Sequence, residues 1–506
     1  MPLWGPIASL QRANSGGLAL SAIIRGPQLA RLLSAWQTPS SVRSIGGRRP
    51  EYVVLAGAVR GLLIDGRLAL GVRLPAEREL AVALGISRTT VTAAYRELRE
   101  SGHLTSRRGA GSWTSLPGGH RVGTSGLLAP SDDADLIDLG CAALPAPPQL
   151  QPAAVEAVND LPAYSAGAGY QPMGIAVLRE QIAESFTERG LPTEPEQIMI
   201  TGGVQQALDL LLRLLIAPGA RVLVETPTYP NALTAFAASR GRLSSYAIGP
   251  DGWDEDLLLS TIRSTQARVA YLIPDFHNPT GHLMPTGLRE RLPSTAHAAG
   301  TDLVIDESFV DLNLDGVPMP PTVACFDRTA RVLTIGGMSK PYWGGLRIGW
   351  IRAAAPLVAR LAAARVGVDM SSPVLDQLVA ARLLAHRHAV IEDRRKLLAA
   401  RRDALVDALR AELPEWRFTV PSGGLSMWVE LDAPVSSALA RAVDELGVRV
   451  APGPLFGADG TMERFFRLPF AQPEEVLREA VHRLALARAD LDRPRRHAWA
   501  SPAVVA

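Results

Sequence analysis

Lysine is nearly absent from this sequence. Of its 52 basic residues only Lys340 and Lys396 are lysines, so arginine carries almost all of the positive charge. A primary amine forms a Schiff base with an aldehyde, whereas a guanidinium does not. Lys396 lies in the charged run 393–396, which is typical of a solvated helix face, but Lys340 follows an apolar run and precedes a glycine pair. We therefore expect Lys340 to be a reactive amine.

Cysteine and long apolar runs are also scarce. Cys141 and Cys325 lie far apart and without metal-ligand spacing, so we expect neither a disulfide framework nor a zinc site, and a reducing, cytoplasmic setting. The longest apolar run, 207–216, is interrupted by two charged residues, so no membrane span is expected. The apolar patch 18–24 lacks the basic flank of a signal peptide.

A chain of 506 residues is too long for one hydrophobic core. Its net charge of +2 names no partner by itself, because a neutral total can hide a basic module. Composition and periodicity predict an N-terminal extension at 1–47, a small domain at 48–115, a flexible linker at 116–135, a large body at 136–490 with a small subdomain mainly at 375–490, and a tail at 491–506.

The segment 48–115 has the pattern of short helices followed by a hairpin. Pro75 suits the start of a helix at 76–84, and Ser87 suits the cap of a helix at 88–101. That second helix has an apolar stripe formed by Val91, Ala94, Tyr95 and Leu98. A basic hairpin with a glycine-bearing tip follows at 104–114. The pattern favours a winged helix-turn-helix over its alternative, a fragment of a helical bundle with solvated arginines.

The same segment resembles the DNA-binding domain of the GntR family of bacterial repressors. The resemblance is carried by the runs Leu74–Ala81, Leu84–Val91 and Arg107–Gly111, with Ala94, Tyr95, Leu98 and Gly102. It implies that double-stranded DNA is contacted by a group near the first helical turns and the wing, namely Arg78, Ser87, Arg88, Thr89, Thr90 and Gly109. Some members have arginine where this chain has Thr92, so a different base preference is expected.

From about residue 136, apolar strand-like runs alternate with helical patterns, which predicts an α/β domain with a mostly parallel sheet. Polar residues follow these runs, where ligands of open α/β sheets bind. The candidates are Gly203 before the helix 204–216, Tyr229, Asn278, Asp306, Ser339, Lys340 and Arg347.

These residues match the chemistry of one ligand. Gly203 at a helix start offers backbone N–H groups to a phosphate, and Tyr229 either stacks on a flat ring or belongs to the core or surface. Asn278 can donate to a phenolate oxygen. Asp306 at a buried strand end requires a cation such as a protonated pyridine nitrogen. With an aldehyde for Lys340 and a phosphate for Ser339 and Arg347, the ligand is pyridoxal 5′-phosphate (PLP).

The order of these residues resembles fold-type I aminotransferases, and further matches are Tyr170–Gly174, Pro421–Leu425 and Arg467–Phe470. The resemblance implies that Lys340 forms the internal aldimine, that Asp306 pairs with the pyridine nitrogen and that the backbone of Val204 and Gln205 holds phosphate. It also implies that Arg467 binds a substrate carboxylate.

Two departures from this family bear on activity. Ser308 and Phe309 stand where the family has a tyrosine that donates to the phenolate oxygen, and Gly337 replaces a serine that donates to phosphate. We expect cofactor binding to survive both changes, whereas the tuning that efficient transamination needs is less secure.

The two modules together have the layout of the MocR subfamily of GntR-type regulators. That resemblance implies a PLP-binding transcription regulator that senses PLP, or its adduct with an amino compound, and forms a head-to-tail homodimer. The main alternative is an active PLP-dependent aminotransferase with a secondary DNA-binding head. A third reading is a structural DNA-binding dimer whose body is inactive.

Overall fold

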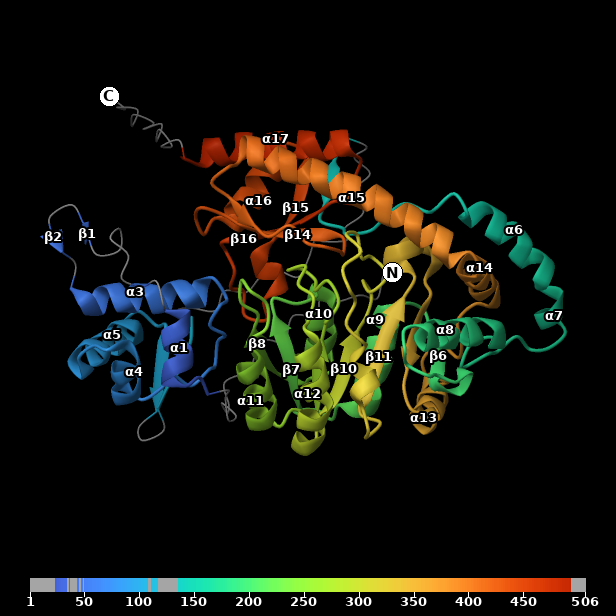
Figure 1. Cartoon of the computed structure of the whole chain (residues 1–506), viewed down its shortest axis with the longest axis horizontal. Coiled ribbons are helices and arrows are strands. Elements are labelled where there is room, and N and C mark those ends of the chain that lie inside the picture. Colours follow the sequence, from blue (N-terminus) through green and yellow to red (C-terminus); the bar gives the residue numbers. More distant parts are fainter. Residues whose placement is uncertain are drawn as a thin grey trace, which may run out of the picture.

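The computed structural model describes residues 23–33, 36, 43–44, 47–48, 50–107, 111–116 and 135–492. Figure 1 shows a small helical head beside a larger body, which carries a second, smaller layer of strands and helices. In these ranges no helix is both long enough and apolar enough to cross a bilayer. Residues 117–134 of the predicted linker, and most of the predicted extension and tail, lie outside the described residues.

The head is a winged helix-turn-helix, as predicted. Its elements are α1 (Gly26–Leu32), the short pair β1 (Arg43–Ser44) and β2 (Gly47–Arg48), α3 (Glu51–Ile64), α4 (Glu77–Leu84), α5 (Arg88–Glu100), β3 (Leu104–Arg107) and β4 (Gly111–Thr114). Ser87 caps α5 by accepting a hydrogen bond from Thr90 N at 3.0 Å. The predicted stripe of α5 is buried against α3 and α4. Gly85 ends α4 in the left-handed region at φ 67°, a conformation that glycine adopts without strain.

The head also includes a segment that the sequence analysis placed in the N-terminal extension. Ile24 N donates to Arg73 O at 3.1 Å, and Gly26 N donates to Glu79 Oε1 at 2.6 Å. Ile24, Leu29 and Leu33 are buried in the same apolar cluster as the three longer helices. The head therefore begins well before residue 48, because this short helix covers apolar surface on α4.

The centre of the body is a mostly parallel seven-stranded sheet. In spatial order its strands are β6 (Ile198–Thr201), β12 (Gly349–Arg352), β11 (Val332–Gly337), β10 (Asp302–Asp306), β9 (Val269–Leu272), β7 (Arg221–Thr226) and β8 (Arg242–Ala247). β12 runs antiparallel to both of its neighbours, β6 and β11, and the other neighbouring pairs are parallel. The parallel strands β7, β9, β10 and β11 therefore deliver their following loops to one edge, as the sequence predicted.

Helices cover both faces of this sheet (Figure 1). One face packs against α6 (Leu150–Asp160), α8 (Ala176–Glu188), α11 (Glu255–Thr265), α12 (Thr286–Ala299) and α14 (Val374–Ala385). The other face packs against α9 (Val204–Leu215), α10 (Pro230–Ala238) and α13 (Ala355–Arg365). The short α7 (Pro162–Ser165) follows α6. Both faces are covered, so the strands are apolar on both sides.

A second sheet forms the smaller layer. Its strands are β13 (Arg417–Phe418), β14 (Ser426–Glu430), β16 (Phe465–Pro469), β15 (Val448–Pro452) and β5 (Ile137–Leu139). It packs against α15 (Arg387–Glu412), α16 (Ser436–Asp444) and α17 (Glu474–Asp492). The small subdomain thus differs from the predicted 375–490: β5 joins it from the start of the body, whereas α14 packs on α6 and α8.

Candidate functional site

The predicted ligand-binding residues converge on one cavity of about 240 Å³. It lies where strands of the large sheet end, and residues of the small layer close it. Nine predicted residues line it, namely Val204, Gln205, Tyr229, Asn278, Asp306, Ser339, Lys340, Arg347 and Arg467. The remaining one, Gly203, caps the helix α9 that begins at the cavity.

The anion-binding end of the cavity is the N-terminus of α9. Gly203 has φ 99°, and a Cβ there would lie 2.7 Å from Arg347 Nη2. Arg347 itself has φ 52°, uncommon for a non-glycine residue, and its Nη2 donates to Gly202 O at 2.7 Å. The first-turn N–H groups of a helix and a guanidinium together suit a phosphate.

Close packing around position 337 explains why a glycine stands there. A Cβ at Gly337 would lie 3.0 Å from Val204 Cγ2 and 3.1 Å from Ile348 O. A serine at this position requires its neighbours to move, so the loss of this phosphate donor accompanies closer packing of β11 against α9.

Asp306 is the buried acid of the cavity. Its Oδ1 accepts from Ser308 N at 2.9 Å and from Ser308 Oγ at 2.5 Å, and its Oδ2 accepts from Tyr271 Oη at 2.6 Å. Burial raises the pKa of Asp306, while these hydrogen bonds and the charge of Lys340 oppose the rise. The carboxylate is thus held by neutral donors, and no ion pair to it occurs within the described ranges.

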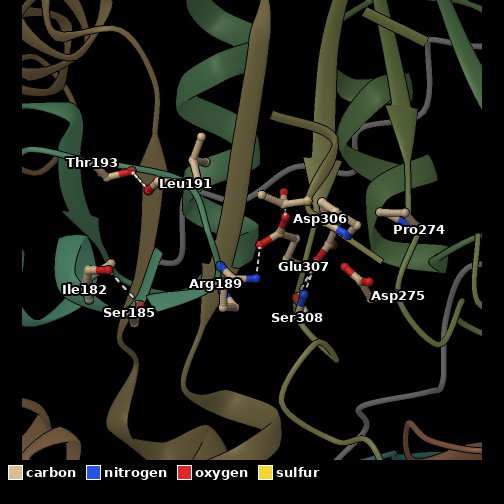
Figure 2. A network of polar contacts seen from close by, with 12 residues as sticks. Ile182, Ser185, Arg189, Leu191, Thr193, Pro274, Asp275, Asp306, Glu307 and Ser308 are labelled. Carbon is tan, nitrogen blue, oxygen red and sulfur yellow. Dashed lines mark hydrogen bonds and ion pairs between the residues drawn. The ribbon is translucent and has the colours of Figure 1, made fainter. Parts of the chain in front are cut away.

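The neighbouring acid, Glu307, serves a different purpose. Figure 2 shows it beside Asp306, joined to Arg189. Arg189 Nη1 lies 2.7 Å from Glu307 Oε2. Thr322 Oγ1 donates to the other carboxylate oxygen of Glu307. Glu307 is therefore neutralised within the body, which leaves Asp306 as the acid that faces the cavity.

Lys340 lies in a turn after β11, with its amine inside the cavity. Its Nζ donates to Ala142 O at 2.8 Å and lies 6.0 Å from the centroid of the Phe309 ring. Burial lowers the pKa of Lys340, and the charges of Arg467 and Arg347 lower it further. A lowered pKa increases the neutral fraction, the form that attacks a carbonyl carbon.

Two polar side chains border the space between these groups. Asn278 is buried, and its Oδ1 has no hydrogen-bond partner within the described chain. Tyr229 caps α10, and its hydroxyl accepts a hydrogen bond from Asn231 Nδ2 at 3.0 Å. A buried amide oxygen normally accepts a hydrogen bond, so a donor group belongs beside Asn278 Oδ1.

Arg467, on β16, is the cation of the opposite wall. It is only 5% exposed, and its Nη2 donates to Gly140 O. Its guanidinium lies 5.1 Å from the centroid of Phe456, while its Nε has no partner in the part of the chain that is described. Burial lowers the pKa of Arg467 to about 10. A buried guanidinium without a carboxylate favours an anionic ligand.

The donor set fits pyridoxal 5′-phosphate. The fit rests on a buried acid without a cation, on a glycine turn that excludes a Cβ beside Arg347, and on the Asn278 side chain at the cavity wall, whose amide nitrogen can donate. A phosphate, a phenolate oxygen, a protonated ring nitrogen and an aldehyde each have a chemically matched partner in one cavity.

The predicted DNA-contacting residues lie on one part of the head. Arg78, Ser87, Arg88 and Thr89 are exposed, and Thr90 is partly exposed, around the N-terminal turns of α4 and α5. Glu77 lies behind them, with its Oε2 4.0 Å from Arg88 Nε and 2.7 Å from Thr92 Oγ1. Gly109 lies outside the described residues.

Sequence reasoning missed a residue that supports the cavity and a loop that lines it. Tyr271 stands in the apolar run 270–273, and a tyrosine in a buried strand needs a partner for its hydroxyl, which was an available signal. The loop 140–143, which provides the acceptors for Lys340 and Arg467, follows a three-residue strand whose pairing with β15 no local pattern reveals.

The fold and the cavity define a class: a winged helix-turn-helix head joined to a fold-type I, PLP-dependent aminotransferase body. Comparison with known families agrees. Residues 134–484 match aminotransferases of class I and II, and residues 51–113 match bacterial regulatory proteins of the gntR family. The chain therefore belongs to the MocR subfamily of GntR-type regulators, and its cofactor is pyridoxal 5′-phosphate.

Some relatives match this chain over both the head and the body, and others match the body alone. The HTH-type transcriptional regulator YisV of Bacillus subtilis (strain 168) is 30% identical over 472 residues, covering 87% of this chain and 95% of that protein. A 2-aminoadipate transaminase of Thermus thermophilus is 32% identical over 330 residues, covering 64% and 81%. The crystal structure of LysN, an alpha-aminoadipate aminotransferase from that species, superposes with a TM-score of 0.65 at 32% identity, covering 71% of this chain and 93% of that one.

Proposed function

We propose that this protein is a DNA-binding transcription regulator whose body binds PLP and responds to an amino compound that carries a carboxylate. The observation that carries the proposal is the position of β16. Arg467 on this strand faces the cavity, and Arg464, just before the strand, contacts the head.

The cofactor supplies an aldehyde that condenses with amines. We assign Lys340 as the amine of the protein that bonds to it, because burial lowers its pKa. Asp306 would pair with the ring nitrogen, Asn278 would donate to the ring oxygen and Tyr229 would stack on the ring. The phosphate is assigned to a further group at the start of α9 and after β11, namely Gly203, Val204, Gln205, Ser339 and Arg347.

Arg467 is the proposed receptor for the carboxylate of the amino compound. In the structure its Nη2 donates to Gly140 O, and Lys340 Nζ donates to Ala142 O two residues further on. One loop therefore satisfies both cations. A carboxylate that binds Arg467 bidentately shares the guanidinium with the Gly140 carbonyl, so we propose that the ligand acts beside the loop that follows β5.

The head contacts the body beside the same strand. Arg464 Nε lies 3.1 Å from Asp65 Oδ1 at the end of α3, and Met462 N donates to Ile64 O at 2.7 Å. Met462 has φ 77°, a left-handed conformation that is uncommon without glycine. A shift of β16 on ligand binding therefore changes the contact that positions the head, which is the differential interaction that an allosteric response requires.

The DNA-binding and subunit-contact surfaces are assigned as part of the same proposal. We assign DNA binding to Arg78, Ser87, Arg88, Thr89, Thr90 and the wing at Gly109. Exposed apolar side chains at Val366, Val368, Met370 and Leu375 support a subunit interface, and the head-to-tail homodimer is proposed from the resemblance to the MocR subfamily.

An active aminotransferase is the second candidate, favoured by the presence of Lys340, Asp306 and Arg467 in one cavity. Phe309 opposes it, because its ring has no hydroxyl to donate to the ring oxygen of the cofactor. Steady-state amino-group transfer from any of a panel of amino acids, abolished by Lys340→Ala, would establish this candidate as the main activity.

A gel-shift titration tests the regulator. The full chain is titrated onto DNA from its own gene neighbourhood, with and without PLP, against a scrambled fragment of equal length. We expect binding that is specific for the native fragment. Equal binding to both fragments in both conditions would refute the proposal.

A further inference from the structure

The hydrogen bonds of Asp306 fill most of its acceptor capacity. An ionised carboxylate offers about four lone-pair sites. Ser308 N and Ser308 Oγ occupy Oδ1, and the hydroxyl of Tyr271 occupies one site of Oδ2. One lone pair of Oδ2 remains, which is the number that a single ring N–H requires.

Tyr271 is placed for this contact by the register of the sheet. It lies on β9 opposite Val304 of β10. Val304 is two residues before Asp306, so Tyr271 and Asp306 lie on the same face of the sheet. Its ring is fully buried and meets Phe236 edge to face, with centroids 5.6 Å apart. Phenylalanine would satisfy that packing, so the hydroxyl serves Asp306.

We propose that Tyr271 is a positioning residue for the cofactor: its hydroxyl keeps the Asp306 carboxylate ionised and directs the remaining lone pair of Oδ2 toward the ring nitrogen of PLP. This inference rests on PLP binding in the cavity described above. It also assigns a supporting role to Ser308, whose two donors hold the other oxygen.

Among the described residues, the titratable groups around Asp306 offer its carboxylate hydrogen bonds but no direct ion pair. The titratable groups that face Asp306 are Tyr271 on β9, Tyr229 at the start of α10 and Lys340 after β11. Burial raises the pKa of both tyrosines, so both remain neutral donors. Lys340 donates to Ala142 O, and its charge acts on Asp306 only from a distance.

Removal of the hydroxyl has a defined sign. A donor to the ionised form lowers the pKa of a carboxyl group, so Tyr271→Phe raises the pKa of Asp306. The ionised form, which pairs with a protonated ring nitrogen, is then populated only at higher pH. The affinity of the variant for PLP therefore falls most at acidic pH and approaches that of the wild-type chain at alkaline pH.

The experiment is a titration of the cofactor-free full chain with PLP, followed by the visible absorption band, from mildly acidic to mildly alkaline pH. Tyr271→Phe is compared with Tyr246→Phe, in which another buried tyrosine loses a hydroxyl that donates to Asp254 O at 3.1 Å. Ser308→Ala removes one of the other donors, and far-ultraviolet circular dichroism monitors the fold of each variant.

For Tyr271→Phe we expect affinity about tenfold lower or worse at the acidic end, as for a lost hydrogen bond to a charged group. The profile shifts to higher pH, Ser308→Ala shifts it in the same direction, and Tyr246→Phe matches the wild-type chain. A Tyr271→Phe profile identical to the wild-type one, or weakened equally at every pH, would overturn the inference. Absence of PLP binding by the wild-type chain would refute the cofactor site itself, and this inference with it.

Discussion

Replacement of Arg467 by methionine is expected to change ligand affinity and stability in opposite directions. Arg467 is buried without an ion pair among the described residues, and burial lowers its pKa from 12.5 to about 10. A lowering of this size corresponds to about 3 kcal/mol. In neutral solution the side chain is protonated in both the folded and the unfolded chain, so its burial opposes folding by that amount.

The variant loses this penalty together with the hydrogen bond to Gly140 O, which contributes about 1 kcal/mol. We therefore expect the free energy of unfolding of the ligand-free chain, measured by urea titration at neutral pH, to rise by about 2 kcal/mol. The affinity of the PLP-loaded chain for amino acids falls, since truncating one partner of a buried charge pair costs about 2–5 kcal/mol, or at least about 30-fold.

Arg402 provides a matched control. It is similarly buried, but its guanidinium is paired with Asp315 and Asp403 at 2.7 and 2.9 Å. Arg402→Met therefore lowers the free energy of unfolding and leaves amino-acid affinity unchanged. Amino-acid affinity is read from the change in the visible band of the bound cofactor. Unchanged affinity in Arg467→Met, or a loss of stability equal to that of Arg402→Met, would refute the reasoning.

Three further predictions concern the head, the contact between head and body, and turnover. Arg88→Ala weakens specific DNA binding by about 1–3 kcal/mol without changing the visible band of the cofactor. Arg96→Ala, further along α5, has a smaller effect, because it removes only a long-range charge. Fluorescence anisotropy measures both variants, and equal losses of DNA affinity would contradict the proposed contact surface. Asp65→Asn breaks the ion pair with Arg464. It reduces the change in DNA affinity that the amino compound produces, while the affinity for PLP stays the same. A change in DNA affinity as large as that of the wild-type chain would show that this contact does not transmit the signal. Phe309→Tyr adds a hydroxyl near the ring oxygen of the cofactor and increases the rate of single-turnover amino-group transfer. An unchanged rate would show that the missing tyrosine does not limit this transfer.

Much of the fold was predictable because local and periodic signals agree in this chain. Ser87 is a strong helix cap, and the predicted helix 88–101 matches α5 to within one residue. In the body, apolar runs end in polar residues, and parallel strands bring those residues to a single edge. Asp306, Lys340 and Asn278 therefore meet in one cavity although they are far apart in the sequence.

The missed features depend on contacts between distant segments. β5 joins the small sheet through β15 near the other end of the body, and only that pairing brings the loop 140–143 to Lys340 and Arg467. The N-terminal helix α1 is short, and its burial depends on the surface of α4. The role of Glu307 was not predicted, because its partner Arg189 lies far away in the sequence.

The central claim is that the amino-compound pocket and the DNA-binding head are energetically linked. The most direct test is the affinity of the full chain for DNA from its own gene neighbourhood, measured by fluorescence anisotropy with PLP alone and with PLP plus each amino acid of a panel. We predict that at least one amino acid changes the affinity by about fivefold or more, and that Arg467→Met abolishes the change. Equal affinities under all conditions, for a chain that binds both PLP and DNA, would contradict the claim.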